Sequence, residues 1–234
     1  RSMPPTHLKK RKRQERALPA AAAEAAPALE ALSADATAAE SVVESAIASD
    51  GRVAKQPKVI IILERACLET GKVGSEHVLL NSDDHHKFLL KHKRLPADYR
   101  PDILHQSMLI LLDSPLNKAG LLKLYVRSEK GVLIEVSPQI RIPRTFRRFC
   151  GLMTQLLFKL SIRASNGPHK LLKVIKNPIT DHLPPNCRIA ALSYTGKLVR
   201  MSDYVKTLPD DSPSVFVVGA MAHGKAFDGF HLFH

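Results

Sequence analysis

The sequence contains no tryptophan, only three cysteines, and no apolar run that approaches the ~20 residues of a membrane-spanning helix. Cys67, Cys150 and Cys187 are far apart and odd in number, so they predict neither a disulfide framework nor a zinc site. Their scarcity favours a reducing compartment. We therefore expect no metal site and no membrane partner.

Acidic residues are outnumbered by basic ones, and the formal net charge of the 234 residues is +13. Residues 1–16 contain seven basic residues and one acidic residue, whereas residues 17–50 contain six acidic residues and no lysine or arginine. These two segments cancel, so the whole excess belongs to residues 51–234. A strongly basic folded part favours a polyanionic partner such as nucleic acid.

The first 56 residues are expected to be a disordered tail. Residues 7–16 form a basic run of the kind that nuclear import reads or that RNA attracts. Residues 17–50 are rich in alanine, glutamate and serine and have too few large apolar side chains to offset the entropy of ordering. We predict one globular domain over residues 57–225.

Strand-like and helix-like patterns alternate along this domain. The β-branched run 59–63 is typical of a strand covered on both faces. Further predicted strands are 121–126, 132–136, 171–175, 188–193 and 215–218, and predicted helices are 85–91, 105–113, 146–160 and 202–208. Residues 128–131 should form the turn between two paired strands. The interleaving predicts an α/β fold with a mostly parallel sheet.

The most informative stretch is residues 139–151, where eight residues at the start of an amphipathic helix hold Arg141, Arg144, Arg147 and Arg148. Thr145 is the expected N-cap, so two of the arginines would lie beside the positive end of the helix dipole. Free amides together with arginines make an anion site, and phosphate is the expected anion. We interpret the stretch as an RNA-binding element; a solvated basic face or a dimer contact are the alternatives.

A second candidate site is the glycine-containing loop that follows the strand 215–218. In open α/β sheets, small molecules bind outside the carboxyl ends of the strands. Gly219 and Gly224 would let the backbone approach a flat ligand, although two glycines in a loop more often mark a plain turn. A generic nucleotide-binding protein is not favoured, because no phosphate loop of the form G-x-x-x-x-G-K-[ST] occurs.

Five long phrases, polar as well as apolar, stand out together: 100–107, 113–120, 141–146, 167–184 and 217–225. They resemble the eukaryotic small-subunit rRNA pseudouridine-N1 methyltransferases, essential nucleolar proteins of the SPOUT class. The resemblance implies an α/β fold whose carboxyl end is threaded into a trefoil knot, and a homodimer. It also implies S-adenosyl-L-methionine as cofactor, small-subunit rRNA precursor as substrate, small-subunit assembly proteins as partners, and a nuclear, nucleolar location.

The resemblance also assigns site residues by position. Those that match the family's rRNA-contacting arginines are Arg100, Arg141, Arg144 and Arg148, and Asp102 matches the carboxylate that steadies the first of them. Those that match the cofactor pocket are Leu192, Gly219, Gly224, Lys225 and Ala226.

The last nine residues depart from the family's pattern. The resemblance implies a further cofactor-binding loop and a final helix after the Gly-Lys pair, whereas residues 226–234 follow neither. We therefore expect an incomplete knot segment in this chain. A non-catalytic rRNA-binding assembly factor is the alternative function.

For catalysis we predict that Arg100, held by Asp102, orients the flipped base or its neighbours, while Arg141, Arg144 and Arg148 hold phosphates. Because the Arg-Pro-Asp sequence is extended by default, a direct pair between Arg100 and Asp102 requires a bend after the proline. A plain surface ion pair is the alternative, and Asp102 as general base is the rival role.

Overall fold

The protein is described here by a computed structural model that covers residues 57–165, 167–209 and 211–225. Its elements in chain order are β1 (Val59–Ala66), β2 (Thr70–Val73), β3 (Glu76–Leu79), α2 (Ser82–Lys91), η3 (Pro96–Asp98), α3 (Pro101–Asp113), α4 (Pro115–Lys118), β4 (Leu122–Ser128), β5 (Leu133–Val136), α5 (Phe146–Lys159), β6 (Ser161–Arg163), β7 (Lys170–Ile175), η4 (Ile179–His182), β8 (Arg188–Ala191), α6 (Met201–Val205) and β9 (Ser214–Gly219). The expected tail over residues 1–56 and the departing residues 226–234 lie outside the described residues.

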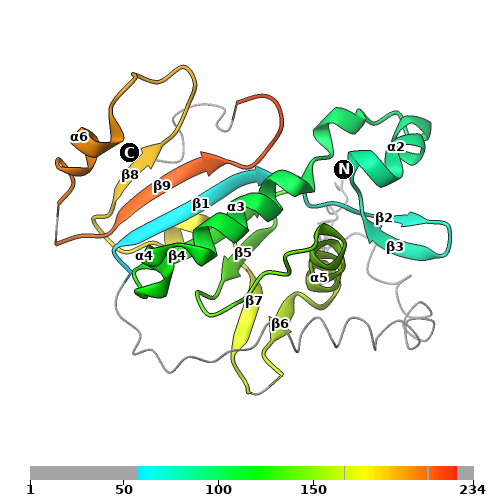
Figure 1. The fold of residues 1–234 in the computed structure, drawn as a ribbon, viewed down its shortest axis with the longest axis horizontal. Coiled ribbons are helices and arrows are strands. Elements are labelled where there is room, and N and C mark those ends of the chain that lie inside the picture. The colour runs from blue at the N-terminus through cyan, green and yellow to red at the C-terminus, as the bar shows by residue number, and fades with distance from the viewer. Residues whose placement is uncertain (1–56, 166, 210, 226–234) are drawn as a thin grey trace, which may run out of the picture. The chain divides into compact units, whose positions relative to one another are not determined.

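Seven strands form one sheet in the order β6-β7-β5-β4-β1-β9-β8, and β2 and β3 form a separate hairpin (Figure 1). Strands β4, β1, β9 and β8 are parallel to one another. Strands β5, β7 and β6 extend the sheet by antiparallel pairing. Strand β1 comes first in the chain and has later strands on both sides, so the direction of winding reverses at β1.

Strand β1 is central because its sequence, VIIILERA, is apolar on both faces over its first five residues. Ile60, Ile62 and Leu63 are almost fully buried. A strand with such a run requires cover on both sides, as parallel sheets provide.

Each face of the sheet has its own core. Helices α3 and α5 cover one face (Figure 1), where Met108 and Phe149 pack among the apolar side chains of the sheet. A smaller cluster, which includes Tyr125, Ile179 and Val217, forms the core of the opposite face. Because α3 and α5 pack against the first face of the sheet, this core fixes the positions of the ends of both helices.

The prediction of an α/β fold is confirmed, and every predicted strand and helix is present. The predicted turn between β4 and β5 forms through hydrogen bonds such as Gly131 N to Ser128 O at 2.9 Å, with Gly131 at φ +80°. Helix α3 begins at Pro101, four residues before the predicted start, because proline suits the first turn of a helix. The short strands β2, β3 and β6 were not predicted.

All three cysteines are free thiols. Burial raises the pKa of Cys67 to about 11 and that of Cys150 to about 12, so both stay protonated at neutral pH. None of the helices in the described ranges has the length and apolar character that crossing a bilayer requires.

Candidate cofactor and RNA-binding site

Arg100 and Asp102 form a two-pronged ion pair at the start of α3. Arg100 Nε donates to Asp102 Oδ1 at 2.8 Å, and Arg100 Nη2 donates to Oδ2 at 2.7 Å. The bend that this pair requires is the helix start itself, since Arg100 is the N-cap and Asp102 lies in the first turn. The hydrogen bonds from Arg100 lower the pKa of Asp102, and the helix dipole favours a carboxylate there. The guanidinium is therefore held in one plane while remaining partly exposed.

All four arginines of residues 141–148, which we call the arginine segment, are exposed. Arg144 Nη2 lies 3.5 Å from Asp113 Oδ2, and with side chains 86% and 61% exposed this is a weak contact. In the part of the chain that the structure describes, Arg141, Arg147 and Arg148 make no ion pair. Thr145 is the N-cap of α5, but its side chain makes no capping hydrogen bond, and the first turn contains no acidic residue. The helix start therefore has both free amides and positive charge for an anion.

His105 connects the arginine segment to α3. Its Nε2 lies 2.7 Å from Pro143 O, and its ring lies 4.6 Å from the ring of Phe149 between centroids. His105 is 1% exposed, so this contact is part of the core. Through Arg144 the segment then reaches Asp113 at the far end of α3, about 20 Å from Arg100 by the helical rise. Arg100 and Arg144 thus mark the two ends of one helix, and His105 was not predicted as a site residue.

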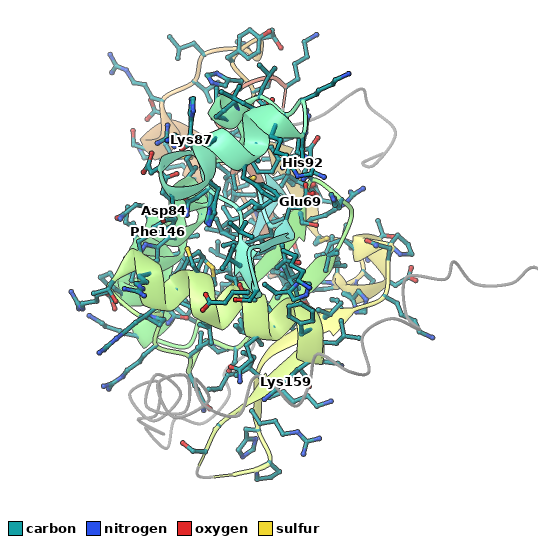
Figure 2. All side chains as sticks on the ribbon, turned by 90° about the vertical axis from the view of Figure 1, so that its right-hand side faces the viewer. Glu69, Asp84, Lys87, His92, Phe146 and Lys159 are labelled. Atoms are coloured by element: carbon teal, nitrogen blue, oxygen red, sulfur yellow. The ribbon has the colours of Figure 1, made fainter. Side chains whose placement is uncertain are left out.

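The basic surface extends well beyond the arginine segment. Residues 136–180 contain nine basic residues and no acidic residue. All nine are exposed, namely Arg141, Arg144, Arg147, Arg148, Lys159, Arg163, Lys170, Lys173 and Lys176. Arg141 and Arg144 precede α5, whose two ends Figure 2 marks by Phe146 and Lys159. The others lie on α5 or on and just after the β6–β7 hairpin that packs against it. The sequence analysis had identified only the first four.

The predicted cofactor residues gather at the carboxyl ends of β1, β8 and β9, which we call the carboxyl edge. Leu192 follows β8 and donates its N–H to Val217 O at 2.9 Å, which places it beside the end of β9 at Gly219. Gly224, at φ +92°, and Lys225 follow in the next loop. Ala226 lies outside the described residues.

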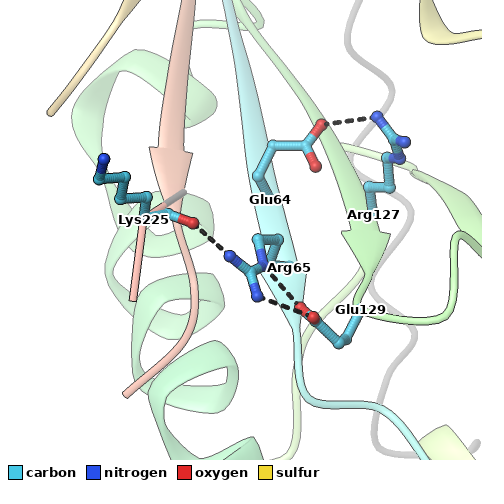
Figure 3. A network of polar contacts seen from close by, with 5 residues as sticks. All are labelled: Glu64, Arg65, Arg127, Glu129 and Lys225. Carbon is cyan, nitrogen blue, oxygen red and sulfur yellow. Dashed lines mark hydrogen bonds and ion pairs between the residues drawn. The ribbon is translucent and has the colours of Figure 1, made fainter. Parts of the chain in front are cut away.

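Arg65 anchors this loop to the end of β1 (Figure 3). Its Nη1 donates to Lys225 O, and its Nε and Nη2 donate to the two carboxylate oxygens of Glu129 at 2.7 and 2.8 Å. The bidentate pair fixes the guanidinium. The loop after β9 is therefore held against β1 and the β4–β5 turn.

Glu64 is a residue of the carboxyl edge that the sequence analysis missed. It is 4% exposed and lies opposite Gly219 in the pairing of β1 with β9. Burial raises its pKa, and Arg127, whose Nη1 lies 3.5 Å from Glu64 Oε1, opposes this rise. The only sequence signal was an acidic residue at the end of an apolar strand.

The sheet carries glycines at its carboxyl edge, and the domain has an exposed arginine surface. This combination is typical of a protein that binds both a small ligand and a polyanion. The model of the EMG1/NEP1 methyltransferase family matches residues 61–231, and this chain belongs to that family. The predicted resemblance is thereby confirmed, and the match continues six residues past Lys225.

Similar proteins are found across eukaryotes and archaea. The chain is 58% identical to the human "Ribosomal RNA small subunit methyltransferase NEP1" over an alignment of 168 residues, which covers 72% of this chain and 68% of that protein. It is 50% identical to the Caenorhabditis elegans "Ribosomal RNA small subunit methyltransferase nep-1" over an alignment of 177 residues, which covers 76% of this chain and 77% of that protein. The crystal structure of Archaeoglobus fulgidus Nep1 bound to S-adenosylhomocysteine superposes with a TM-score of 0.59 at 26% identity, over 76% of this chain and 82% of that one.

The residues at the carboxyl edge fit an S-adenosyl ligand. Leu192, 44% exposed, offers an apolar surface of the kind that suits a flat ring. Gly219 leaves the backbone open to close approach. Glu64 offers a buried acceptor oxygen, Oε1, that makes no hydrogen bond within the described residues and has only the 3.5 Å contact with Arg127 Nη1.

Proposed function

We propose that this chain transfers a methyl group from S-adenosylmethionine to N1 of a pseudouridine in small-subunit rRNA, and so serves small-subunit biogenesis. The observation that carries the proposal is the exposed arginine segment: three of its four guanidinium groups make no ion pair in the described ranges, next to a helix start that lacks acidic residues. Cations that no carboxylate neutralises remain available for phosphates.

The chain's own residues hold the cofactor and the RNA in this reaction and stabilise the charge that develops on the base. Bound S-adenosylmethionine supplies the electrophilic methyl group. Pseudouridine N1 carries a hydrogen, and it becomes a good nucleophile when its proton leaves and the ring carbonyls take up negative charge. Arg100 is the proposed group that stabilises this charge, since a single fixed donor contributes about 3–4 kcal/mol to such a step.

The proposed site residues keep the roles expected for them. Arg100 contacts the base and Asp102 fixes its guanidinium plane. Phosphates are held by Arg141, Arg144 and Arg148. The cofactor is held by Leu192, Gly219, Gly224, Lys225 and Ala226.

Homodimerisation, contact with small-subunit assembly proteins and a nucleolar location also belong to the proposal. So does the division into a tail over residues 1–56, a catalytic domain over 57–225 and a distinct end over 226–234. Support for a partner surface comes from exposed apolar side chains between β8 and β9. Leu198 is 97% exposed, and Val199 and Val205 are each 51% exposed.

The test is methyl transfer from radiolabelled S-adenosylmethionine to a small-subunit rRNA hairpin with one pseudouridine, beside a control hairpin with uridine at that position. We expect label in the first hairpin alone, and its loss in Arg100→Ala. RNA binding without any binding of S-adenosylhomocysteine would instead assign the chain as a non-catalytic assembly factor.

A further inference from the structure

Glu64 occupies the point of the sheet where ligands of α/β proteins bind. It lies at the carboxyl end of β1, between the parallel strands β4 and β9, where the direction of winding reverses. Its backbone carbonyl accepts the N–H of Ala220 at 2.7 Å, so it also fixes the first residue of the loop after β9.

The carboxylate of Glu64 is buried without full compensation. Its Oε1 makes no hydrogen bond within the described residues, although Arg127 Nη1 lies 3.5 Å away. A buried carboxylate offsets its desolvation only when its ion pair has close geometry and further donors satisfy its remaining lone pairs, and a 3.5 Å contact alone does not provide this. The long contact with Arg127 therefore leaves Oε1 able to accept a further hydrogen bond.

The neighbourhood of Glu64 is shaped for a ligand. Glu64 pairs with Gly219, and paired residues of parallel strands point to the same face of the sheet. On that face the position beside the carboxylate has no side chain. Leu192, bonded to Val217 on the next strand, lies at the same edge. Figure 3 shows the Glu64 side chain directed away from Arg65 and its contacts, toward Arg127.

We propose that Glu64 is a cofactor-binding residue whose carboxylate accepts a hydrogen bond from an S-adenosyl ligand. This inference rests on the proposed function, which places that ligand at the carboxyl edge. The ligand has two kinds of donor that suit a carboxylate: the ribose hydroxyls and the ammonium group of its amino-acid part. Either the ribose hydroxyls or the ammonium group would donate the hydrogen bond that Oε1 of Glu64 does not receive within the described residues.

The experiment is calorimetric titration of the full chain with S-adenosylhomocysteine, for wild type, Glu64→Gln and the matched control Arg127→Gln. Because a hydrogen bond to a charged group contributes about 1.5–3 kcal/mol, Glu64→Gln should weaken binding by about 10- to 100-fold. Arg127→Gln removes the ion pair but leaves the acceptor oxygen in place, so it should weaken binding less than Glu64→Gln does. A parallel titration with adenosine separates the donors: a loss for both ligands indicates the ribose, and a loss for S-adenosylhomocysteine alone indicates the ammonium group.

Three results on the variants would overturn the proposal, and a fourth, on wild type, would overturn it together with the proposed function. Equal affinity of wild type and Glu64→Gln would remove Glu64 from the site and leave the proposed function intact. Equal losses in Glu64→Gln and Arg127→Gln would assign Glu64 to the ion pair. A Glu64→Gln protein that melts well below wild type would show that the carboxylate serves the fold. If wild type itself binds no S-adenosylhomocysteine, the proposed function fails, and this inference fails with it.

Discussion

His105 Nε2 lies 2.7 Å from the carbonyl oxygen of Pro143, and this contact attaches the arginine segment to α3. A carbonyl oxygen only accepts, so Nε2 must carry the hydrogen. The ring also packs against Phe149, which is fully buried. The contact therefore fixes where the arginines stand relative to the start of α3, where Arg100 is held.

Replacing His105 by alanine should destabilise the domain and weaken RNA binding together. The loss of one buried hydrogen bond and of the ring packing should lower the free energy of unfolding by about 2–4 kcal/mol, measured by urea denaturation. His86→Ala, at an exposed position on α2, is the control and should stay within about 0.5 kcal/mol of wild type. A His105→Ala protein as stable as this control would mean that the segment is held by other contacts.

The Arg100–Asp102 pair should matter for transfer rather than for cofactor binding. Arg100→Lys keeps the charge but loses the two parallel hydrogen bonds, so methylation should fall by about 100-fold or more while S-adenosylhomocysteine affinity is unchanged. Single-turnover methylation and calorimetry measure the two quantities. Equal losses in both would remove Arg100 from the transfer step.

Asp102→Asn separates the two roles of the carboxylate. If Asp102 only supports Arg100, the amide still accepts one hydrogen bond and part of the activity remains. If Asp102 removes the N1 proton, activity falls to the level of Asp102→Ala. Comparing the single-turnover rates of the two variants decides between support and base catalysis.

Glu69 should contribute to stability in a pH-dependent way. It accepts from Arg94, from Tyr99 OH at 3.1 Å and from Lys130 Nζ at 2.8 Å. Burial raises its pKa, but the hydrogen bonds from Lys130 and Arg94 outweigh burial, and the net pKa is lowered. A lowered folded-state pKa gives stability that is present above the unfolded-state value of about 4.3 and is lost as pH falls through the folded-state value.

Glu69→Gln should therefore lower the free energy of unfolding at pH 7 by about 1–3 kcal/mol. At a pH well below the unfolded-state value of about 4.3 the difference from wild type should shrink, because the wild-type carboxyl also becomes protonated as pH falls through its lowered folded-state pKa. Urea denaturation at both pH values measures this, with the exposed Glu76→Gln as control. A difference that stays constant with pH would show that the charge of Glu69 is not what its partners recognise.

The long elements could be predicted because apolar periodicity alone determines them. In α5 the buried residues Phe149, Met153 and Leu156 recur at helical spacing, as the sequence showed. The hairpin of β2 and β3 could not be predicted, because it buries little beyond Leu79 and depends on packing against α5. Short polar strands have no periodic signal of their own.

The site residues also fall into those that the sequence predicts and those that it does not. A cluster of arginines or a repeated glycine is visible in the sequence, and so is an Arg-Pro-Asp phrase. Glu64 and His105 are single polar residues at the end of a strand and inside a helix, positions where most such side chains are solvated. Only the tertiary partners, Gly219 for one and Pro143 for the other, distinguish them from solvated residues.

The arginine segment should determine the salt dependence of RNA binding. Each guanidinium that neutralises a phosphate contributes about one unit to the slope of log K against log salt, so Arg148→Gln should flatten the slope by about one. Arg144→Gln should do the same, since its contact with Asp113 is long and exposed. Filter binding of a small-subunit rRNA hairpin over a range of potassium concentrations measures the slope.

Lys206→Gln is the control, and the slope for this variant should match that of wild type. Lys206 is the C-cap of α6, and its Nζ lies 3.5 Å from Oδ1 of Asp203. Helix α6 lies at the opposite end of the sheet from the β6–β7 hairpin and α5 (Figure 1). Unchanged slopes in both arginine variants, together with a smaller mass by sedimentation, would instead assign Arg144 and Arg148 to a contact between protomers.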